Sequence, residues 1–249
     1  MRGGALNYEF VRPSLAVADG RPRYSACVAG AEDLATGDRA AIVDLLGGLA
    51  YGELSAFDRL ADDARMAPTL SGRAEMSAMA AVEFGHYQRL ADRLTELGVA
   101  PEAAMEPFVA AIETFHALTE PSTWLESVVK AYVGDGLAGD FYREVAAFAD
   151  ESTRALIVEV LTDAGRAEFA VREVTAAVAE QPALAGRLGL WGRRLVGEAI
   201  SQTQHVLADR DALVMLLVSG AGDLTGIAGL IGRITVRHEQ RMDELGLKN

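Results

Sequence analysis

Three side chains capable of binding a metal recur at helical spacing in the first half of the chain. Glu83 and His86 stand three residues apart in an apolar segment, so a helix places both on one face. Glu53 lies thirty residues upstream of Glu83, which is the separation expected between matching levels of two antiparallel helices joined by a short loop. Carboxylates and an imidazole are ligands that suit a divalent transition metal. The spacing therefore predicts a metal site between two helices.

A second pair of acidic residues nearly repeats this arrangement further along the chain. Asp135 and Asp163 are twenty-eight residues apart, close to the thirty that separate Glu53 from Glu83. A full repeat would place a second histidine at position 166, but Arg166 stands there. A guanidinium stays protonated and cannot bind a metal. We therefore expect Arg166 to form an ion pair with Asp163 in place of a ligand.

These residues predict an asymmetric metal site. The first set is complete enough to hold one divalent ion, whereas the arginine supplies the charge and fills the volume of a second ion. Asp135 would act as a bridging or fourth ligand. We expect at most one tightly held metal per chain. The candidate ligands are Glu53, Glu83, His86, Asp135 and Asp163.

Apolar residues at helical spacing predict two long helices that carry the first three ligands. The first helix is expected over about 39–64, after an N-cap in the segment Thr36–Asp38. The second is expected over about 71–98, where Ser71 caps its start and Gly98 ends it. Together they form one half of a helical bundle.

Two further long helices are expected to carry the second set. Thr123 and Glu126 have the spacing of a capping box, which predicts a third helix over about 124–148. Asp150 is positioned to cap a fourth helix that continues until Pro182. The four helices are predicted to form the core of the protein.

The remaining segments predict additional helices and no strand. A short helix is expected at 108–118 in the connection between the two halves, and two more at about 183–209 and 223–245. Residues 1–35 show no sustained period and are expected to form an irregular arm. The fold class is therefore all-α, with one helical domain over 36–249 that has a four-helix bundle and additional C-terminal helices.

Composition excludes several classes of function. The chain has 249 residues, half of them hydrophobic, and a net charge of −13, so its field repels polyanions and tight binding to bulk nucleic acid is not expected. The single cysteine, Cys27, cannot form an internal disulfide, which favours a reducing compartment. The chain's start has no apolar signal region, and no membrane association is expected. These features predict a cytoplasmic protein.

Several motifs carry a family resemblance. They are Tyr51-Gly-Glu53, Glu83-Phe-Gly-His86, Lys130-Ala-Tyr-Val-Gly-Asp135, Asp140-Phe-Tyr142 and Asp163-Ala-Gly-Arg166. Over roughly residues 39–245 the chain resembles the MiaE-like branch of the ferritin-like di-iron superfamily, which is named for a tRNA hydroxylase. The resemblance implies a ferritin-like bundle, one or two iron ions, and an O2-dependent hydroxylase or monooxygenase activity on an organic, nucleoside-linked substrate. Such an oxidoreductase also needs an electron donor.

Two functions from different classes stay open at this point. The first is the iron-dependent oxidoreductase, acting on a small molecule or modified nucleoside. The second is a ferritin-like binding or scaffold protein with a degenerate site that holds one metal or none, in which Arg166 and the carboxylates form a buried ion network. A homodimer is a further open alternative. Aromatic residues and lone histidines at helical spacing are more often packing or surface residues than functional ones; these are Tyr51, Tyr132, Tyr142, His116, His205 and His238.

Overall fold

The computed structural model describes residues 31–162, 165–222 and 224–247. These residues form nine α-helices and a short 3-10 helix, and they contain no strand. The expected all-α class is confirmed. The helices are α1 (Ala31–Asp63), α2 (Leu70–Glu96), α3 (Pro101–Leu118), α4 (Trp124–Ala146), α5 (Glu151–Val160), α6 (Arg166–Glu180), α7 (Ala183–Asp209), α8 (Asp211–Ala221) and α9 (Leu224–Glu244), with the 3-10 helix η1 (Ala64–Met66) after α1.

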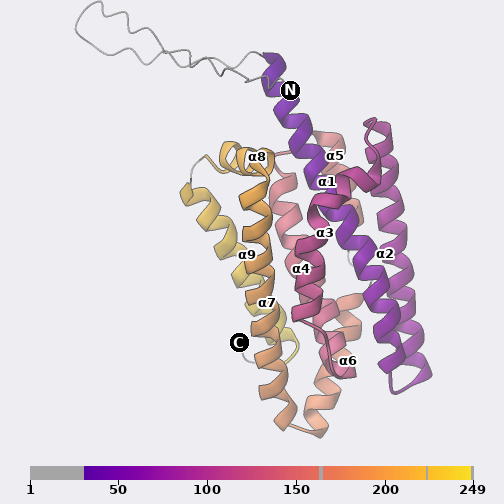
Figure 1. The fold of residues 1–249 in the computed structure, drawn as a ribbon. Helices are drawn as coiled ribbons and strands as arrows, with labels where there is room; N and C mark the ends of the chain where they lie inside the picture. Colours follow the sequence, from indigo (N-terminus) through magenta and orange to yellow (C-terminus); the bar gives the residue numbers. More distant parts are fainter. Residues whose placement is uncertain (1–30, 163–164, 223, 248–249) are drawn as a thin grey trace, which may run out of the picture.

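The helices pack as two pairs with further helices around them (Figure 1). Helices α1 and α2 lie side by side and are joined by η1, and α4 packs against both α5 and α6. Helix α3 lies between α1 and α7, while α7 and α9 both cover α4 and α8 packs on α1. The predicted core of paired long helices with extra C-terminal helices is therefore present.

The apolar core consists of two clusters, and the buried polar residues Glu53, Glu83 and His86 lie between members of these clusters along α1 and α2, forming a polar layer. One cluster includes Leu60 and Met76, and the other includes Leu46 and Leu90. Burying each such side chain contributes about 1.5–3 kcal/mol, so the two clusters fix the helices above and below the layer between them. Glu53 lies on α1 between the two clusters, and it is itself buried. The scaffold thus holds a carboxylate where an apolar residue would ordinarily pack.

Helix boundaries follow the expected capping chemistry at some ends and not at others. The predicted start at Trp124 is confirmed, because the Thr123 hydroxyl accepts a hydrogen bond from the backbone N–H of Glu126 at 3.3 Å. The predicted cap at Ser71 is wrong, since Thr69 fills that role by accepting from the backbone N–H of Gly72 at 3.0 Å. A hydroxyl at either position could have capped the helix, and the chain uses the earlier one.

Two boundaries of the first half differ from the prediction in other ways. Helix α1 begins at Ala31, so the predicted start near 39 and the N-cap in the segment Thr36–Asp38 are wrong, and the last residues of the expected arm are helical. Residues 1–30 lie outside the described part of the chain. Helix α2 ends at Glu96 before Gly98, which adopts a φ of 72°, a left-handed conformation that glycine tolerates. This end was predicted correctly.

The predicted fourth helix is interrupted. Helix α5 ends at Val160 and α6 begins at Arg166, where the single continuous helix was expected. Gly165 precedes α6 with a φ of 88°, a backbone conformation that is incompatible with a continuing helix. The break places Arg166 in the first turn of α6. Its positive charge there is opposed by the helix dipole, so nearby carboxylates are needed to offset it.

The connection between the halves and the C-terminal region contain more helix than expected. The short helix predicted at 108–118 is an 18-residue helix, α3, that starts with Pro101 at its first position. Helix α8 was not predicted, whereas α7 and α9 lie where helices were expected. One stretch, Arg39–Met66, is long and apolar enough to cross a membrane, but 61% of its apolar window is buried against other helices, which is typical of a core helix.

Candidate metal centre

Three of the predicted ligands lie together in the polar layer between the two apolar clusters. Glu53 comes from α1, and Glu83 and His86 come from α2. The Nδ1 atom of His86 lies 3.3 Å from Glu53 Oε2 and 3.3 Å from Glu83 Oε2. One donor atom from each residue lies within 4.8 Å of the others, and all three residues are buried. The helical spacing was enough to bring these side chains to one point.

The donor set fits a single divalent metal ion. Metal ions of this class bind nitrogen and oxygen at roughly 2.0–2.2 Å, so one ion can join donors up to about 4.4 Å apart, and the 3.3 Å from His86 to each carboxylate lies within that reach. Two buried carboxylates facing one imidazole also need a positive charge, because an ionised carboxylate is costly to remove from water. A divalent ion would meet both requirements.

Arg166 extends from α6 into the same layer. Its NH1 group donates to Glu83 Oε1 and lies 3.2 Å from Asp135 Oδ1. The expected partner, Asp163, lies outside the described residues, so that ion pair stays a prediction, and among the described residues Arg166 pairs with Glu83 and Asp135. Burial lowers the pKa of Arg166, and the negative charge of Glu53 opposes that effect.

Glu83 links the two halves of the site. One of its oxygens, Oε1, accepts from Arg166, and the other, Oε2, faces His86. A single carboxylate therefore bridges from the candidate metal position to the guanidinium. Asp135 stands on the guanidinium side, with a side chain that is 37% exposed, and it does not join the three-residue cluster.

The charges of this layer leave room for one divalent cation. Among the described residues, the carboxylates of Glu53, Glu83 and Asp135 carry a formal charge of −3 and Arg166 contributes +1, which leaves −2. One divalent ion would neutralise this remainder. A second such ion would create an excess of positive charge in a buried layer and would lie against a guanidinium.

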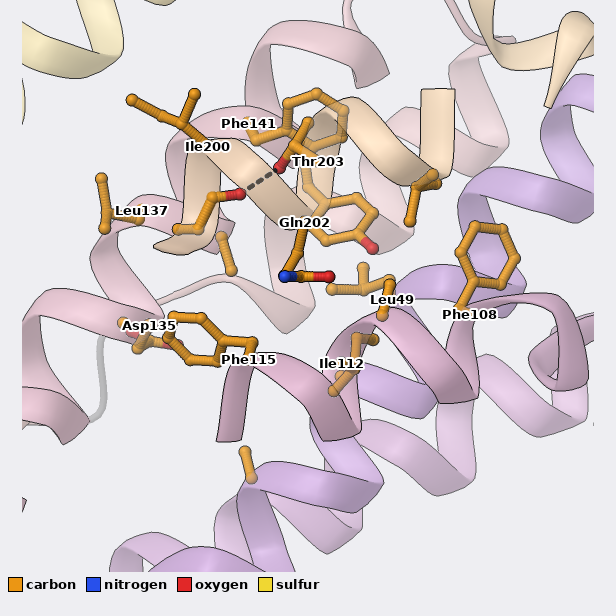
Figure 2. A pocket seen from close by; sticks show the side chains of 18 of the residues that line it. Leu49, Phe108, Ile112, Phe115, Asp135, Leu137, Phe141, Ile200, Gln202 and Thr203 are labelled. Carbon is orange, nitrogen blue, oxygen red and sulfur yellow. Dashed lines mark hydrogen bonds between the residues drawn. The ribbon is translucent and has the colours of Figure 1, made fainter. Parts of the chain in front are cut away.

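A cavity of about 340 Å³ adjoins the site. Side chains from α1, α3, α4 and α7 line it, and most are apolar, including Leu49, Phe115 and Phe141 (Figure 2). Both Glu53 and Glu83 line the cavity, so the carboxylate face of the cluster opens to it. The size is within the range of pockets that hold small organic ligands.

Helix α7 contributes a cavity residue that sequence reasoning missed. The amide of Gln202 projects into the cavity among apolar side chains (Figure 2). A polar group in an apolar pocket commonly orients a ligand. Nothing in the local sequence distinguishes Gln202 from a solvent-facing glutamine, because only the packing of α7 on α3 and α4 turns it inward.

The three tyrosines near the ligands have different surroundings. Tyr142 lines the cavity, and burial together with the charge of Glu53 raises its pKa, so it stays a protonated phenol. Tyr51 donates a hydrogen bond to Glu113 Oε1 at 2.8 Å, and burial and that bond raise its pKa to about 12. Tyr132 donates to Glu244. Only Tyr142 therefore lies where it could contact a ligand in the cavity.

Asp140, which belongs to one of the motifs, has a structural role. Its carboxylate pairs with Arg241 and lies 3.7 Å from Arg237 and 3.8 Å from Arg143. These contacts fasten α9 to α4. The residue is thus fully engaged in helix packing at some distance along α4 from the ligands.

The family comparison agrees with the fold. A family described as a ferritin-like domain of actinomycetes matches residues 37–220, which is most of the chain. The chain belongs to this ferritin-like family. A search of curated proteins found no match.

In ferritin-like di-metal bundles, each half supplies one carboxylate from its first helix and a carboxylate and histidine, three residues apart, from its second. The first half of this ferritin-like chain contains that full set in Glu53, Glu83 and His86. The second half places Asp135 on α4 and Arg166 on α6. One half of the bundle therefore contains a candidate set of metal ligands, and the other supplies a fixed cation.

Proposed function

We propose that the protein is an iron-dependent oxidoreductase that holds one iron ion at Glu53, Glu83 and His86 and uses O2 to hydroxylate an apolar organic molecule. The observation that carries the proposal is the position of the buried cluster at the wall of an apolar cavity. A ligand in this cavity would lie against the carboxylate face of the cluster. The resemblance to the MiaE-like hydroxylase branch gives the same reaction class.

The choice of ligands supports iron and oxygen chemistry. Iron, when bound, supplies redox electrons and open coordination positions for O2, which a site with one imidazole and two carboxylates leaves available. Hydroxylation of a C–H bond consumes O2, two electrons and two protons and yields an alcohol and water. An external electron donor is therefore part of the proposal.

The residues around the cluster would have separate roles. Arg166 binds the Oε1 oxygen of Glu83 and holds it away from the metal position, so that Oε2 faces His86. The apolar lining excludes water from the substrate, which prevents side reactions. Gln202 is positioned to orient a polar group of the substrate, and the Tyr142 phenol can donate a hydrogen bond from the cavity wall. A nucleoside-linked substrate would insert only its apolar substituent.

One observation favours a second function. The guanidinium of Arg166 already neutralises part of the acidic layer, so the site can be read as a buried ion network in a ferritin-like binding protein that uses the cavity without a metal. The two functions differ in whether an ion is held at His86. They share the cavity and therefore share the expectation that apolar ligands bind.

Turnover with labelled oxygen tests the proposal. Protein loaded anaerobically with Fe²⁺ is mixed with ascorbate, oxygen-18 gas and a panel of apolar probes such as octane, cyclohexane and naphthalene. We expect products that contain one labelled oxygen atom. His86→Ala should abolish product formation, whereas His205→Ala, which changes an exposed histidine on α7, should leave it unchanged.

The outcomes separate the two functions. Product formation that is equal in the unmodified protein and in His86→Ala would refute the role of the cluster. Binding of iron without labelled product from any probe would refute the oxygenase. Failure to bind iron, together with binding of the apolar probes, would support the metal-free binding protein.

A further inference from the structure

Lysine is nearly absent from this chain. The sequence contains twenty-one arginines but only two lysines, Lys130 and Lys248. Lys248 lies outside the described residues. Lys130 is 7% exposed, on α4, whereas the described arginines that form surface ion pairs are largely exposed. The interior of the protein thus contains a primary amine in a sequence that otherwise uses guanidinium groups.

Lys130 lies where two cavities meet. It lines the large apolar cavity, and it also lines a smaller polar pocket of about 250 Å³. Asp63 from α1 and His116 from α3 line both cavities as well. An apolar ligand and water therefore both have access to the amine. Phe115, which lines the apolar cavity, has its ring centroid 5.6 Å from the Lys130 nitrogen.

The structural role of Lys130 does not require a lysine. Its Nζ donates to the carbonyl of Thr119, the C-cap of α3, at 2.8 Å. At two other helix ends an arginine forms the equivalent hydrogen bond. Arg39 donates to the carbonyl of Leu97, the C-cap of α2, and Arg143 donates to the carbonyl of Leu161, the C-cap of α5. A lysine differs from an arginine in one relevant respect. Its amine can lose a proton and become a nucleophile, which a guanidinium cannot do in a protein.

We propose that Lys130 is a nucleophilic amine that forms an imine with an apolar aldehyde bound in the central cavity. The amine lone pair attacks the carbonyl carbon, and the new C–N bond replaces the carbon–oxygen bond. The carbonyl oxygen leaves as water with the two hydrogens of the amine nitrogen. No oxidant or reductant is consumed, so this chemistry is independent of the metal and extends beyond the oxidoreductase function.

The neighbouring groups suit proton transfer in this reaction. Burial lowers the pKa of His116 to about 3, and the positive charges of Lys130 and Arg59 lower it in the same direction, so the imidazole is neutral. Its Nδ1 atom is buried and has no hydrogen-bond partner among the described residues. Burial raises the pKa of Asp63 to about 6, which places its carboxyl near the protonation range of a general acid. An acid thus borders the amine, and the neutral His116 imidazole adds no second positive charge beside it.

The reaction should depend on pH in a defined direction. Burial lowers the pKa of Lys130 from 10.5 to about 8, so at neutral pH the deprotonated fraction of this amine is roughly three hundredfold that of an ordinary lysine. The rate of imine formation should therefore rise as the pH approaches 8. The charged or titratable groups around the amine are Asp63, Arg59, Glu113, His116 and Glu120.

Reductive trapping tests the proposal. The full-length protein, with no metal added, is incubated with dodecanal and cyanoborohydride, which reduces an imine to a stable secondary amine. Intact mass and peptide mapping then locate the dodecyl group. We expect a dodecyl group on Lys130, added at least about tenfold faster than on Lys248, the internal reference, while any label on the N-terminal α-amine is read from its own peptide. An excess of dodecane, which has no carbonyl, should slow the labelling of Lys130 by filling the cavity.

Two variants complete the experiment. Lys130→Arg retains the donor to Thr119, so it should keep the melting temperature close to that of the unmodified protein and lose the label at this position. Lys248→Arg should leave labelling of Lys130 unchanged. The proposal is overturned if Lys130 in the folded, unmodified protein is labelled no faster than Lys248, or if dodecane has no effect on its rate. Because no metal takes part, failure here leaves the iron-dependent function untouched.

Discussion

The two halves of the bundle have the same helical framework but neutralise buried carboxylates in different ways. On the α1–α2 side, Glu53, Glu83 and His86 converge, and each is at most 9% exposed. On the α4–α6 side, Asp135 is partly exposed and pairs with Arg166. One half thus presents a candidate set of metal ligands, and the other has a permanent cation. The comparison shows that, in a ferritin-like bundle, a single long cationic side chain contacts buried and partly buried carboxylates where the other half has a histidine.

Glu83 shows why the halves are not independent. It faces His86 with one oxygen and accepts from Arg166 with the other. An arginine that bound both oxygens of Glu83 would lower the affinity of the site for a metal. Here the guanidinium binds only Oε1, and Oε2 still faces His86. The pairing instead fixes the carboxylate in place, since the 1% exposed residue has little room to rotate. The ion pair is therefore expected to support a one-metal site.

The largest expected effect is the loss of metal binding on removal of the only imidazole in the cluster. His86→Ala should weaken Fe²⁺ or Co²⁺ binding on the order of a thousandfold, about 4 kcal/mol, because only two carboxylates of the set remain. Isothermal titration calorimetry with Co²⁺ measures the change. His205→Ala is the matched control. An unchanged affinity in His86→Ala would show that the ion binds elsewhere.

Removal of the cation from the second half should destabilise the protein. Arg166→Leu leaves Glu83 and Asp135 without the guanidinium that both contact, and breaking a buried ion pair in this way costs about 3–5 kcal/mol. Urea denaturation of metal-free protein gives the free energy of unfolding. Arg172→Leu removes an exposed pair with Glu75 and should cost no more than about 1 kcal/mol.

Measuring the free energy of unfolding of Arg166→Leu and Arg172→Leu with metal present tests whether an ion can take the place of the guanidinium. If the guanidinium substitutes for an ion, excess divalent metal should restore part of the stability that Arg166→Leu loses. Equal free energies of unfolding for Arg166→Leu and Arg172→Leu would contradict the account of a buried, structurally required cation.

Conversion of the second half into a ligand set should raise the metal capacity. Arg166→His exchanges the fixed charge for a neutral donor, so the protein should bind two ions per chain, the second roughly tenfold or more weakly because aspartate is shorter than glutamate. Equilibrium dialysis with Co²⁺ counts the ions. A capacity that stays at one would mean that the position of α6, rather than the arginine, prevents a second site.

The smallest effect is expected at the exposed edge of the second half. Asp135→Asn removes a charge that lies 3.2 Å from Arg166 and is partly exposed to solvent, so it should lower the free energy of unfolding by no more than about 1 kcal/mol. Affinity for the first metal should change less than threefold. A large loss of metal affinity would instead make Asp135 a ligand, as the sequence predicted.

Local signals predicted much of the framework from sequence. The capping residues of α4, the glycine that ends α2 and the bounds of α7 all follow from side-chain hydrogen bonding and apolar period. The sequence did not predict the break before Arg166, because a single glycine such as Gly165 is also tolerated inside a helix. Its φ of 88°, which ends the helical path, is visible only in the structure. The full length of α3 was missed because its two prolines suggested a loop, although Pro101 starts the helix.

Only the part of the site that follows from helical spacing was predicted from the sequence. Periodicity brings Glu53, Glu83 and His86 together, and whether they hold a metal stays a prediction. The contact between Arg166 and Glu83 could not be derived, because an arginine side chain reaches across the bundle and its partner depends on where α6 begins. The cavity, including the part lined by Lys130, depends on how α3 and α7 pack. The apolar period of the sequence does not determine that packing.

The most direct test of the central claim is to count and locate iron in the unmodified protein. Protein produced in iron-supplemented medium is analysed by inductively coupled plasma mass spectrometry, and crystals are measured on both sides of the iron absorption edge. The account predicts one iron per chain, with a single anomalous peak between Glu53, Glu83 and His86 and with Arg166 still bonded to Glu83. Two fully occupied peaks with Arg166 turned away, or no iron at saturating concentration, would contradict it.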